Sequence, residues 1–293
     1  MKKSTDETRV GISGWRFPPW RKVFYPPGLA QRKELEYASR QLNSIELNGS
    51  FYALQSPESY QRWFHETPDD FQFSIKATQY VTHIRRLKDC EIPLANFFGS
   101  GLLHLEHKLG PVLWQLPPSF LFYQERFEEF LPLLPRTFAE AAKLSLKADR
   151  VEPSFSKSAK SSQRKIRHAI EVRHHSFENP DFVKLLRKHD IALVFADTSG
   201  KWPYLEDLTS DFVYLRLHGE KEIYKSGYDD KALLFWKERI AYWKRGEQVS
   251  DALTLIDGKP TKLRRSVYAY FDNDQKIQAP FDAMRLQKML QKN

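Results

Sequence analysis

Apolar and polar side chains alternate with a period of two in five short segments of the chain. These segments are residues 45–48, 73–76, 170–173, 215–218 and 270–273. The period is that of a β-strand, whose successive side chains point to opposite faces of a sheet. A charged side chain in a half-buried strand is costly unless it is paired or used, so these strands predict a shared polar site.

The hydrophobic pattern as a whole predicts eight strands that alternate with helices. The expected strands are residues 9–13, 44–48, 71–77, 111–116, 168–173, 192–197, 212–218 and 266–272. Helical periodicity lies between them, at residues 29–42, 57–66, 94–107, 124–134, 181–189, 231–245 and 281–290. The connection from the sixth strand to the seventh, residues 198–210, lacks a helical pattern.

Strands that alternate with helices pair in parallel, and eight of them can close into a (β/α)₈ barrel without an exposed edge. A doubly wound open sheet is the alternative fold. We favour the barrel because the strand count matches it and because no glycine-rich phosphate-binding turn follows the first strand. The expected architecture is therefore a single α/β domain of the TIM-barrel type over residues 1–293.

In this fold the active site lies at the C-terminal ends of the strands. Polar side chains that the pattern places at that end are Glu46, Asn48, Lys76, Gln115, Glu171, Arg173, Asp197, Arg216, His218, Asp272 and Asn273. We expect these side chains to surround one pocket.

The formal net charge of +9 is concentrated in one segment. Residues 143–167 hold eight basic and two acidic side chains, a net charge of +6. The serine-rich centre of this segment predicts a mobile, solvated insertion at about residues 149–165. This insertion and a second one at about residues 247–265 each run from a helix into a strand. Both are expected at the end of the barrel opposite the pocket, so the charge alone does not predict a nucleic-acid interface.

Cysteine content and hydropathy predict a soluble cytoplasmic protein. Cys90 is the only cysteine, which excludes an internal disulfide and fits a reducing compartment. No apolar stretch approaches the roughly 20 residues of a membrane helix. The polar and acidic N-terminus does not resemble a signal peptide.

Several motifs together resemble a known family. They are residues 11–15 (Gly-Ile-Ser-Gly-Trp), 46–52 (Glu-Leu-Asn-Gly-Ser-Phe-Tyr), 73–77, 113–118 (Leu-Trp-Gln-Leu-Pro-Pro), 171–173, 214–219 and 270–274. In this order they resemble the YecE-like family of uncharacterised proteins, domain of unknown function seventy-two. The resemblance covers about residues 10–290 and implies a TIM-type barrel, but no established activity. The two insertions depart from the family pattern.

The carboxylates of the expected pocket allow two interpretations. Glu46, Glu171 and Asp272, together with His218, are compatible with a hard divalent metal ion. Alternatively, the carboxylates neutralise buried cations. No local metal-ligand motif is present, so any cofactor is unknown from the sequence.

The cations of the pocket favour an anionic ligand. Lys76, Arg173 and Arg216 converge from three strands, and guanidinium groups bind phosphate or carboxylate through paired hydrogen bonds. The alternative is that each cation is already matched by a carboxylate. Lys76 could form a Schiff base if it were desolvated, but the sequence gives no sign of a lowered pKa.

Histidines and aromatic residues complete the expected site. His218 is the candidate for proton transfer, and His83 could reach the same mouth. Trp15 and Tyr228 are candidate ligand contacts, together with the side-chain amides of Asn48, Gln115 and Asn273, because aromatic faces with convergent polar groups suit a sugar or a nucleotide.

Three functions remain open at this stage. The first is a barrel enzyme that uses His218 with Glu171 or Glu46 in acid–base chemistry on a small anionic or phosphorylated substrate. The second is a nucleic-acid-binding protein or metal-dependent nuclease whose aromatic rim stacks bases. The third is a non-catalytic ligand-binding protein that uses the same pocket.

Overall fold

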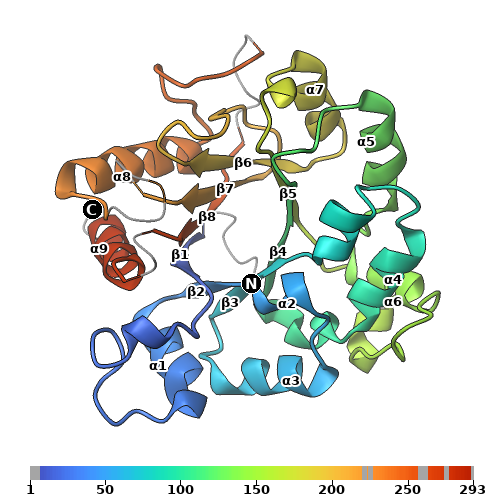
Figure 1. Cartoon of the computed structure of the whole chain (residues 1–293), viewed down its shortest axis with the longest axis horizontal. Coiled ribbons are helices and arrows are strands. Elements are labelled where there is room, and N and C mark those ends of the chain that lie inside the picture. Colours follow the sequence, from blue (N-terminus) through green and yellow to red (C-terminus); the bar gives the residue numbers. More distant parts are fainter. Residues whose placement is uncertain (1–6, 220–222, 224–226, 257–262, 274–276, 292–293) are drawn as a thin grey trace.

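The computed structural model describes residues 7–219, 223, 227–256, 263–273 and 277–291. Its eight strands form one closed parallel barrel in sequence order. Figure 1 shows the strands around the centre and the helices in a ring outside them. The strands are β1 (Thr8–Ser13), β2 (Ser44–Leu47), β3 (Gln72–Lys76), β4 (Leu109–Gln115), β5 (His168–Glu171), β6 (Ala192–Asp197), β7 (Phe212–Leu217) and β8 (Ser266–Phe271). The predicted TIM-type barrel is confirmed.

The helices lie between the strands. The α-helices are α1 (Glu34–Gln41), α2 (Gly49–Tyr52), α3 (Pro57–Glu66), α4 (Glu91–Gly99), α5 (Gln124–Phe130), α6 (Phe138–Ser145), α7 (Pro180–Lys188), α8 (Asp230–Arg245) and α9 (Ala279–Gln291). Shorter turns are η1 (Pro18–Trp20), η2 (Gln31–Lys33), η3 (Tyr80–Ile84), η4 (Leu102–Lys108), η5 (Leu131–Leu133), η6 (Lys157–Lys160) and η7 (His175–Phe177). The connection between β6 and β7 contains no helix, as expected.

Apart from the short helix α2, two helical regions differ from the prediction. The helix expected at residues 94–107 is interrupted at Gly101, which adopts φ +114° and lies so close to Pro57 that a Cβ would come within 2.6 Å of its Cα. The chain therefore enters η4 in a new direction. Helix α6 was not predicted, although Thr137 caps its N-terminus by accepting a hydrogen bond from the Glu140 amide. It is only eight residues long, so few turns of its apolar face are present in the sequence.

The interior of the barrel is lined by tyrosines and small side chains. The Tyr270 hydroxyl lies 2.6 Å from Ser44 Oγ and 2.7 Å from Ser74 Oγ, and the Tyr214 hydroxyl donates to Glu46. Gly11 on β1 allows the close approach of β2, because a Cβ at this position would lie 1.9 Å from the Ser44 carbonyl oxygen. The strands that carry the polar mouth are thus held on a tightly packed and hydrogen-bonded interior.

The two insertions are anchored at the N-terminal end of the barrel. In the basic insertion, the Ser154 amide donates to the carbonyl of Gly99, and Ala159 is buried. In the second insertion, backbone amides of Leu253 and Leu255 donate to the buried carboxylates of Glu206 and Asp207. Residues 257–262 of the second insertion lie outside the described residues.

Candidate functional site

Arg216 crosses the C-terminal mouth of the barrel and binds carboxylates from other strands. Its Nη2 and Nε donate to the two oxygens of Glu46 at 2.9 and 3.1 Å, and its Nη1 donates to Glu171 Oε2 at 2.7 Å. Asp272, just after β8, lies 3.4 Å from Nη2. The other oxygen of Glu171 accepts from Arg173 Nε at 2.7 Å. Five of the predicted strand-end residues therefore form one network: Glu46, Glu171, Arg173, Arg216 and Asp272.

The centre of this network is buried. Arg216 is 1% exposed, while Glu46 and Glu171 are 0% exposed. Burial opposes ionisation of Glu171, but Arg173 and Arg216 outweigh it and hold its pKa well below the usual range. Burial also opposes the charge on Arg216, whereas Glu46 and Glu171 raise its pKa well above the usual value. Each charge of this buried group thus depends on the others.

A cavity of about 720 Å³ opens above the network. Its lining residues are Phe17, Asn48, Phe51, Tyr52, Lys76, Gln79, His83, Gln115, Arg173, Arg216 and Asp272. Seven of the predicted site residues are in this set: Asn48, Lys76, His83, Gln115, Arg173, Arg216 and Asp272. Glu46 and Glu171 are not; they lie behind the wall and hold Arg216.

Lys76 differs from Arg173 and Arg216, the other cations of the cavity wall, in its lack of an ion pair among the described residues. Among the described residues, no carboxylate lies within ion-pair distance of its amine, and Nζ lies 4.3 Å from the centre of the Phe51 ring. Burial and the nearby Arg216 lower the pKa of Lys76 to about 8. Arg173 also faces the cavity, and its guanidinium stacks 3.8 Å from the Trp202 ring. Of the described residues, only Glu171 forms an ion pair with it.

His83 lies on the same side of the cavity as Lys76. It belongs to η3, a single π-helical turn after β3, and π turns recur at functional sites. Its ring packs edge-on against Phe51 at 5.0 Å, and Nδ1 lies 2.8 Å from Thr82 Oγ1. Burial and the charge of Lys76 lower the pKa of His83 to about 4, so the imidazole is neutral at neutral pH.

Comparison with known proteins places the chain in a family. The profile described as protein of unknown function DUF72 matches residues 9–293. The chain belongs to this family. YunF of Bacillus subtilis is 35% identical over 116 residues, and YecE of Escherichia coli is 32% identical over 111 residues. These matches cover 38% of this chain in both cases, and 40% and 38% of the relatives.

Solved DUF72 structures share the whole architecture. A DUF72 protein from Thermotoga maritima superimposes with a TM-score of 0.73 and 25% identity over 98% of this chain and 100% of its own. A DUF72 protein from Enterococcus faecalis gives a TM-score of 0.68 at 16% identity over 98% of this chain and 96% of its own. The barrel is thus the fold of the DUF72 family, and the expected family resemblance is confirmed.

In this DUF72 barrel His218 does not line the cavity, although it was the predicted residue for proton transfer to a ligand. It is 0% exposed, does not line the cavity and packs edge-on against Trp202 at 6.2 Å. Nε2 lies 3.4 Å from Arg216 Nη1, and burial lowers the pKa of His218 to about 3. The imidazole is placed to support the network rather than to touch a ligand. The histidine that lines the cavity is His83.

Three other predicted contacts lie away from the central cavity. Trp15 is buried against Trp63 and lines an adjoining pocket of about 250 Å³, which shares Phe17, Asn48 and Tyr52 with the central cavity. Tyr228 donates its hydroxyl to Asp197 and lines a separate pocket of about 500 Å³. Asn273 is buried and donates to Asp282. Trp15 and Asn273 each follow the end of a strand by two residues, whereas Tyr228 lies in the loop just before α8.

Four residues line the cavity without having been predicted as site residues: Phe17, Phe51, Tyr52 and Gln79. Phe51 and Tyr52 lie on α2, a four-residue helix that directly follows β2 and is too short to show periodicity. Their signal in the sequence was their position five and six residues after the strand-end Glu46, a distance that keeps a loop residue near the mouth.

The carboxylates that were considered as metal ligands are bound to Arg216. Within the ranges that the structure describes, no three side chains of histidine, cysteine, aspartate or glutamate come together as a metal site. The set Glu46, Glu171, Asp272 and His218 surrounds a guanidinium group. The arrangement therefore favours the interpretation in which carboxylates neutralise cations.

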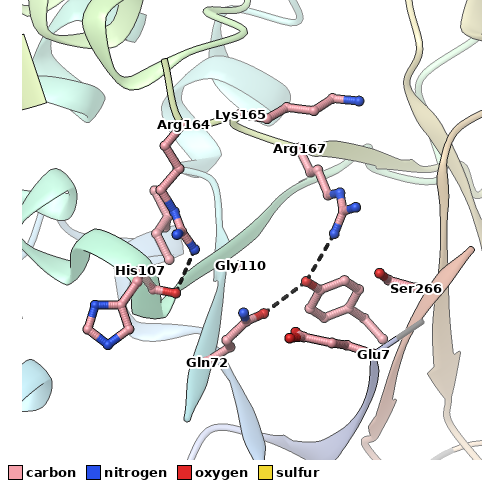
Figure 2. A pocket seen from close by; sticks show the side chains of 10 residues that line it. Glu7, Gln72, His107, Gly110, Arg164, Lys165, Arg167 and Ser266 are labelled. Atoms are coloured by element: carbon pink, nitrogen blue, oxygen red, sulfur yellow. Dashed lines mark hydrogen bonds between the residues drawn. The ribbon is translucent and has the colours of Figure 1, made fainter. Parts of the chain in front are cut away.

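The basic insertion contributes to a different cavity, at the opposite end of the barrel. Figure 2 shows Arg164 and Arg167 beside a cavity of about 260 Å³. Arg164 Nη2 donates to the carbonyl of His107 at 2.6 Å, while Arg167 reaches the Tyr268 hydroxyl. This hydroxyl donates to Gln72 Oε1, near the start of β3. The positive charge of the insertion thus lies at the N-terminal face, as its place between helix and strand predicted.

Proposed function

We propose that this protein is an enzyme that binds a small anionic or phosphorylated substrate in the 720 Å³ cavity and acts on it by proton transfer. One observation carries the proposal. Lys76 and Arg173 face the cavity, and within the described part of the chain Lys76 has no carboxylate partner while Arg173 has one. Their donors are therefore available to an anion, whereas Arg216 is saturated by carboxylates.

Proton transfer is assigned to groups at the wall. Lys76, with a pKa of about 8, and His83, neutral at pH 7, both contact Phe51 and line the cavity. A catalytic acid or base works best when its pKa is close to the working pH, a condition that Lys76 meets and His83, with a pKa of about 4, does not. Lys76 is therefore the proton-transfer group of the proposal, and neutral His83 lies beside it on the Phe51 ring. Glu46, Glu171 and His218 support these groups from behind by fixing Arg216 and Arg173. This assignment replaces His218 as the proton-transfer residue.

The lining also limits the class of substrate. Tyr52 is 75% exposed at the rim, and Phe17 and Phe51 add two further aromatic faces. Flat aromatic faces beside cations suit a sugar phosphate or a nucleotide. Asn48, Gln79 and Gln115 provide amides for hydroxyl groups.

Thermal shift against a panel of anions tests the proposal. We expect stabilisation by phosphorylated sugars, nucleotides or carboxylates, and its loss in Arg173→Gln. Arg164→Gln is the matched control, because it removes a guanidinium at the opposite cavity. Arg216→Ala is a poor probe, since it would disrupt the buried network itself. The proposal fails if no anion stabilises the protein, or if Arg173→Gln responds like the wild type.

A nucleic-acid ligand is the second candidate, favoured by the exposed Tyr52 beside cations. Binding to oligonucleotides would fall steeply with salt and would require Tyr52. Arg164→Gln would weaken it only if the basic insertion takes part.

We further propose a cytoplasmic location. Its support is the single cysteine, Cys90, which is buried and whose pKa burial raises to about 12. Within the described residues, none of the helices combines the length and the apolar character needed to cross a membrane.

A further inference from the structure

Lys76 is held on a rigid element with its amine at the cavity. It is the last residue of β3, where it pairs with Leu113 of β4, and its carbonyl accepts a hydrogen bond from Ser50 Oγ at 2.7 Å. Its side chain lines the central cavity together with Arg173 and Arg216. A reactive group on a strand is positioned more accurately than one on a loop.

Other lysines with a perturbed pKa have the partners that Lys76 lacks. Lys108 is buried, but its Nζ donates to the carbonyls of Phe64 and Thr67. Lys165 lies between Asp190 and Asp211 and has a raised pKa. In the part of the chain that the structure describes, Lys76 contacts an aromatic ring and has arginines nearby. An amine that is desolvated and close to other cations has the two properties of a nucleophilic lysine.

The neutral fraction of such an amine is large. With a pKa of about 8, about a tenth of Lys76 is unprotonated at pH 7. For a lysine at 10.5 the same fraction is about 0.03%. The environment therefore raises the concentration of the reactive form about 300-fold.

We propose that Lys76 forms a covalent imine with a small aldehyde or ketone that carries a negatively charged group. The inference rests on the proposed function, because Arg173 in the same cavity would bind the anionic group while Nζ attacks the carbonyl carbon. The substrate class is thus narrowed to oxo acids and phosphorylated carbonyl compounds.

The chemistry balances without a cofactor. The unprotonated Nζ attacks the carbonyl carbon, a C–N bond forms, and one proton moves from nitrogen to oxygen to give the carbinolamine. A second proton, taken up from solvent, releases the oxygen as water and leaves the protonated imine. Solvent also accepts the proton that Lys76 loses beforehand, so the proton count balances. The imine carries the same single positive charge as the original ammonium.

Reductive trapping tests the inference. The full-length protein would be incubated with glyoxylate or glycolaldehyde phosphate and sodium cyanoborohydride, which reduces an imine to a secondary amine. Peptide mass mapping would then locate the adduct. We expect it at Lys76, at least tenfold faster than at the exposed Lys201, and faster for glycolaldehyde phosphate than for uncharged glycolaldehyde. The trapping rate should rise about fivefold from pH 7 to pH 8, as the neutral fraction does.

Lys76→Arg separates the inference from the proposed function. This variant keeps the positive charge but cannot form the imine, so it should lose the adduct, while the anion-induced thermal shift of the wild-type protein tests the proposed function on its own. Lys108→Arg is the control and should retain the adduct at Lys76. Anion stabilisation without an adduct at Lys76, or labelling equal to that of Lys201, would overturn the inference and leave the proposed function standing. Absence of both stabilisation and adduct would overturn both.

Discussion

Replacing Lys76 with methionine should stabilise the protein at neutral pH. The protonated amine is partly buried and, among the described residues, has no ion-pair partner. Lowering its pKa from 10.5 to about 8 corresponds to about 3 kcal/mol of unfavourable free energy in the folded state. Because part of the side chain remains exposed to water, we expect Lys76→Met to raise the free energy of unfolding by about 1–3 kcal/mol.

The pH dependence gives this prediction a definite sign. Below about pH 8 Lys76 is protonated in both states, so the advantage of the methionine variant is complete. Between about pH 8 and 10.5 the folded wild type has lost a proton that the unfolded chain still holds, and wild-type stability rises relative to the variant. Above 10.5 the electrostatic advantage is gone.

Urea denaturation followed by circular dichroism measures the effect, and Lys108→Met is the matched control. Lys108 is also buried, but its Nζ donates to two carbonyls. Its removal should therefore destabilise the protein by about 1–3 kcal/mol, because those carbonyls lose their partner. If Lys76→Met were destabilised as much as Lys108→Met, the inference of an unpaired amine would be refuted.

The buried network and a strand glycine yield further outcomes. Arg216→Met leaves Glu46 and Glu171 buried without their main partner. Urea denaturation should show that the free energy of unfolding falls by about 3–5 kcal/mol, and a fall of less than about 1 kcal/mol would contradict this account. Gly11→Ala places a Cβ 1.9 Å from a carbonyl oxygen and should be far more destabilising in thermal melts than Gly49→Ala, whose nearest contact is at 3.6 Å. Because the pKa of Glu171 is lower in the folded protein than in the unfolded chain, its ionised form stabilises the protein above about pH 4.3, and this stability is lost in acid. Thermal melts from pH 6 to pH 3 should therefore show a smaller loss of stability for Glu171→Gln than for the wild type.

The sequence predicted the barrel well because each of its parallel strands is a short apolar run, and helical periodicity lies between most of these runs. Each strand has a continuous apolar face toward the helices, and the polar exceptions collect at the C-terminal end. The interruption at Gly101 was not predictable in the same way, since it depends on contact with Pro57 in another helix. Local patterns carry no information about such an approach.

The sequence predicted which residues lie near the mouth of the barrel, but not which of their side chains contact one another. Arg216 and His218 are both placed at the mouth by the alternation of β7. Their different environments depend on Trp202, which packs against His218 from the irregular connection between β6 and β7. Glu46 and Glu171 bind Arg216, so these carboxylates are not available to pair with Lys76. Such competition between side chains from distant strands has no signature in a linear pattern.

The ion pairs of Arg216 also have a consequence for the lifetime of the folded protein. They join residues that lie 170 and 45 positions apart in the chain. Such contacts form only after β2, β5 and β7 have come together, because distant segments must first lose the entropy of the loops between them. Interactions that are absent from the folding transition state slow unfolding without accelerating folding. Because these ion pairs join distant segments of the chain, we expect them to slow unfolding of the barrel more than they accelerate its folding.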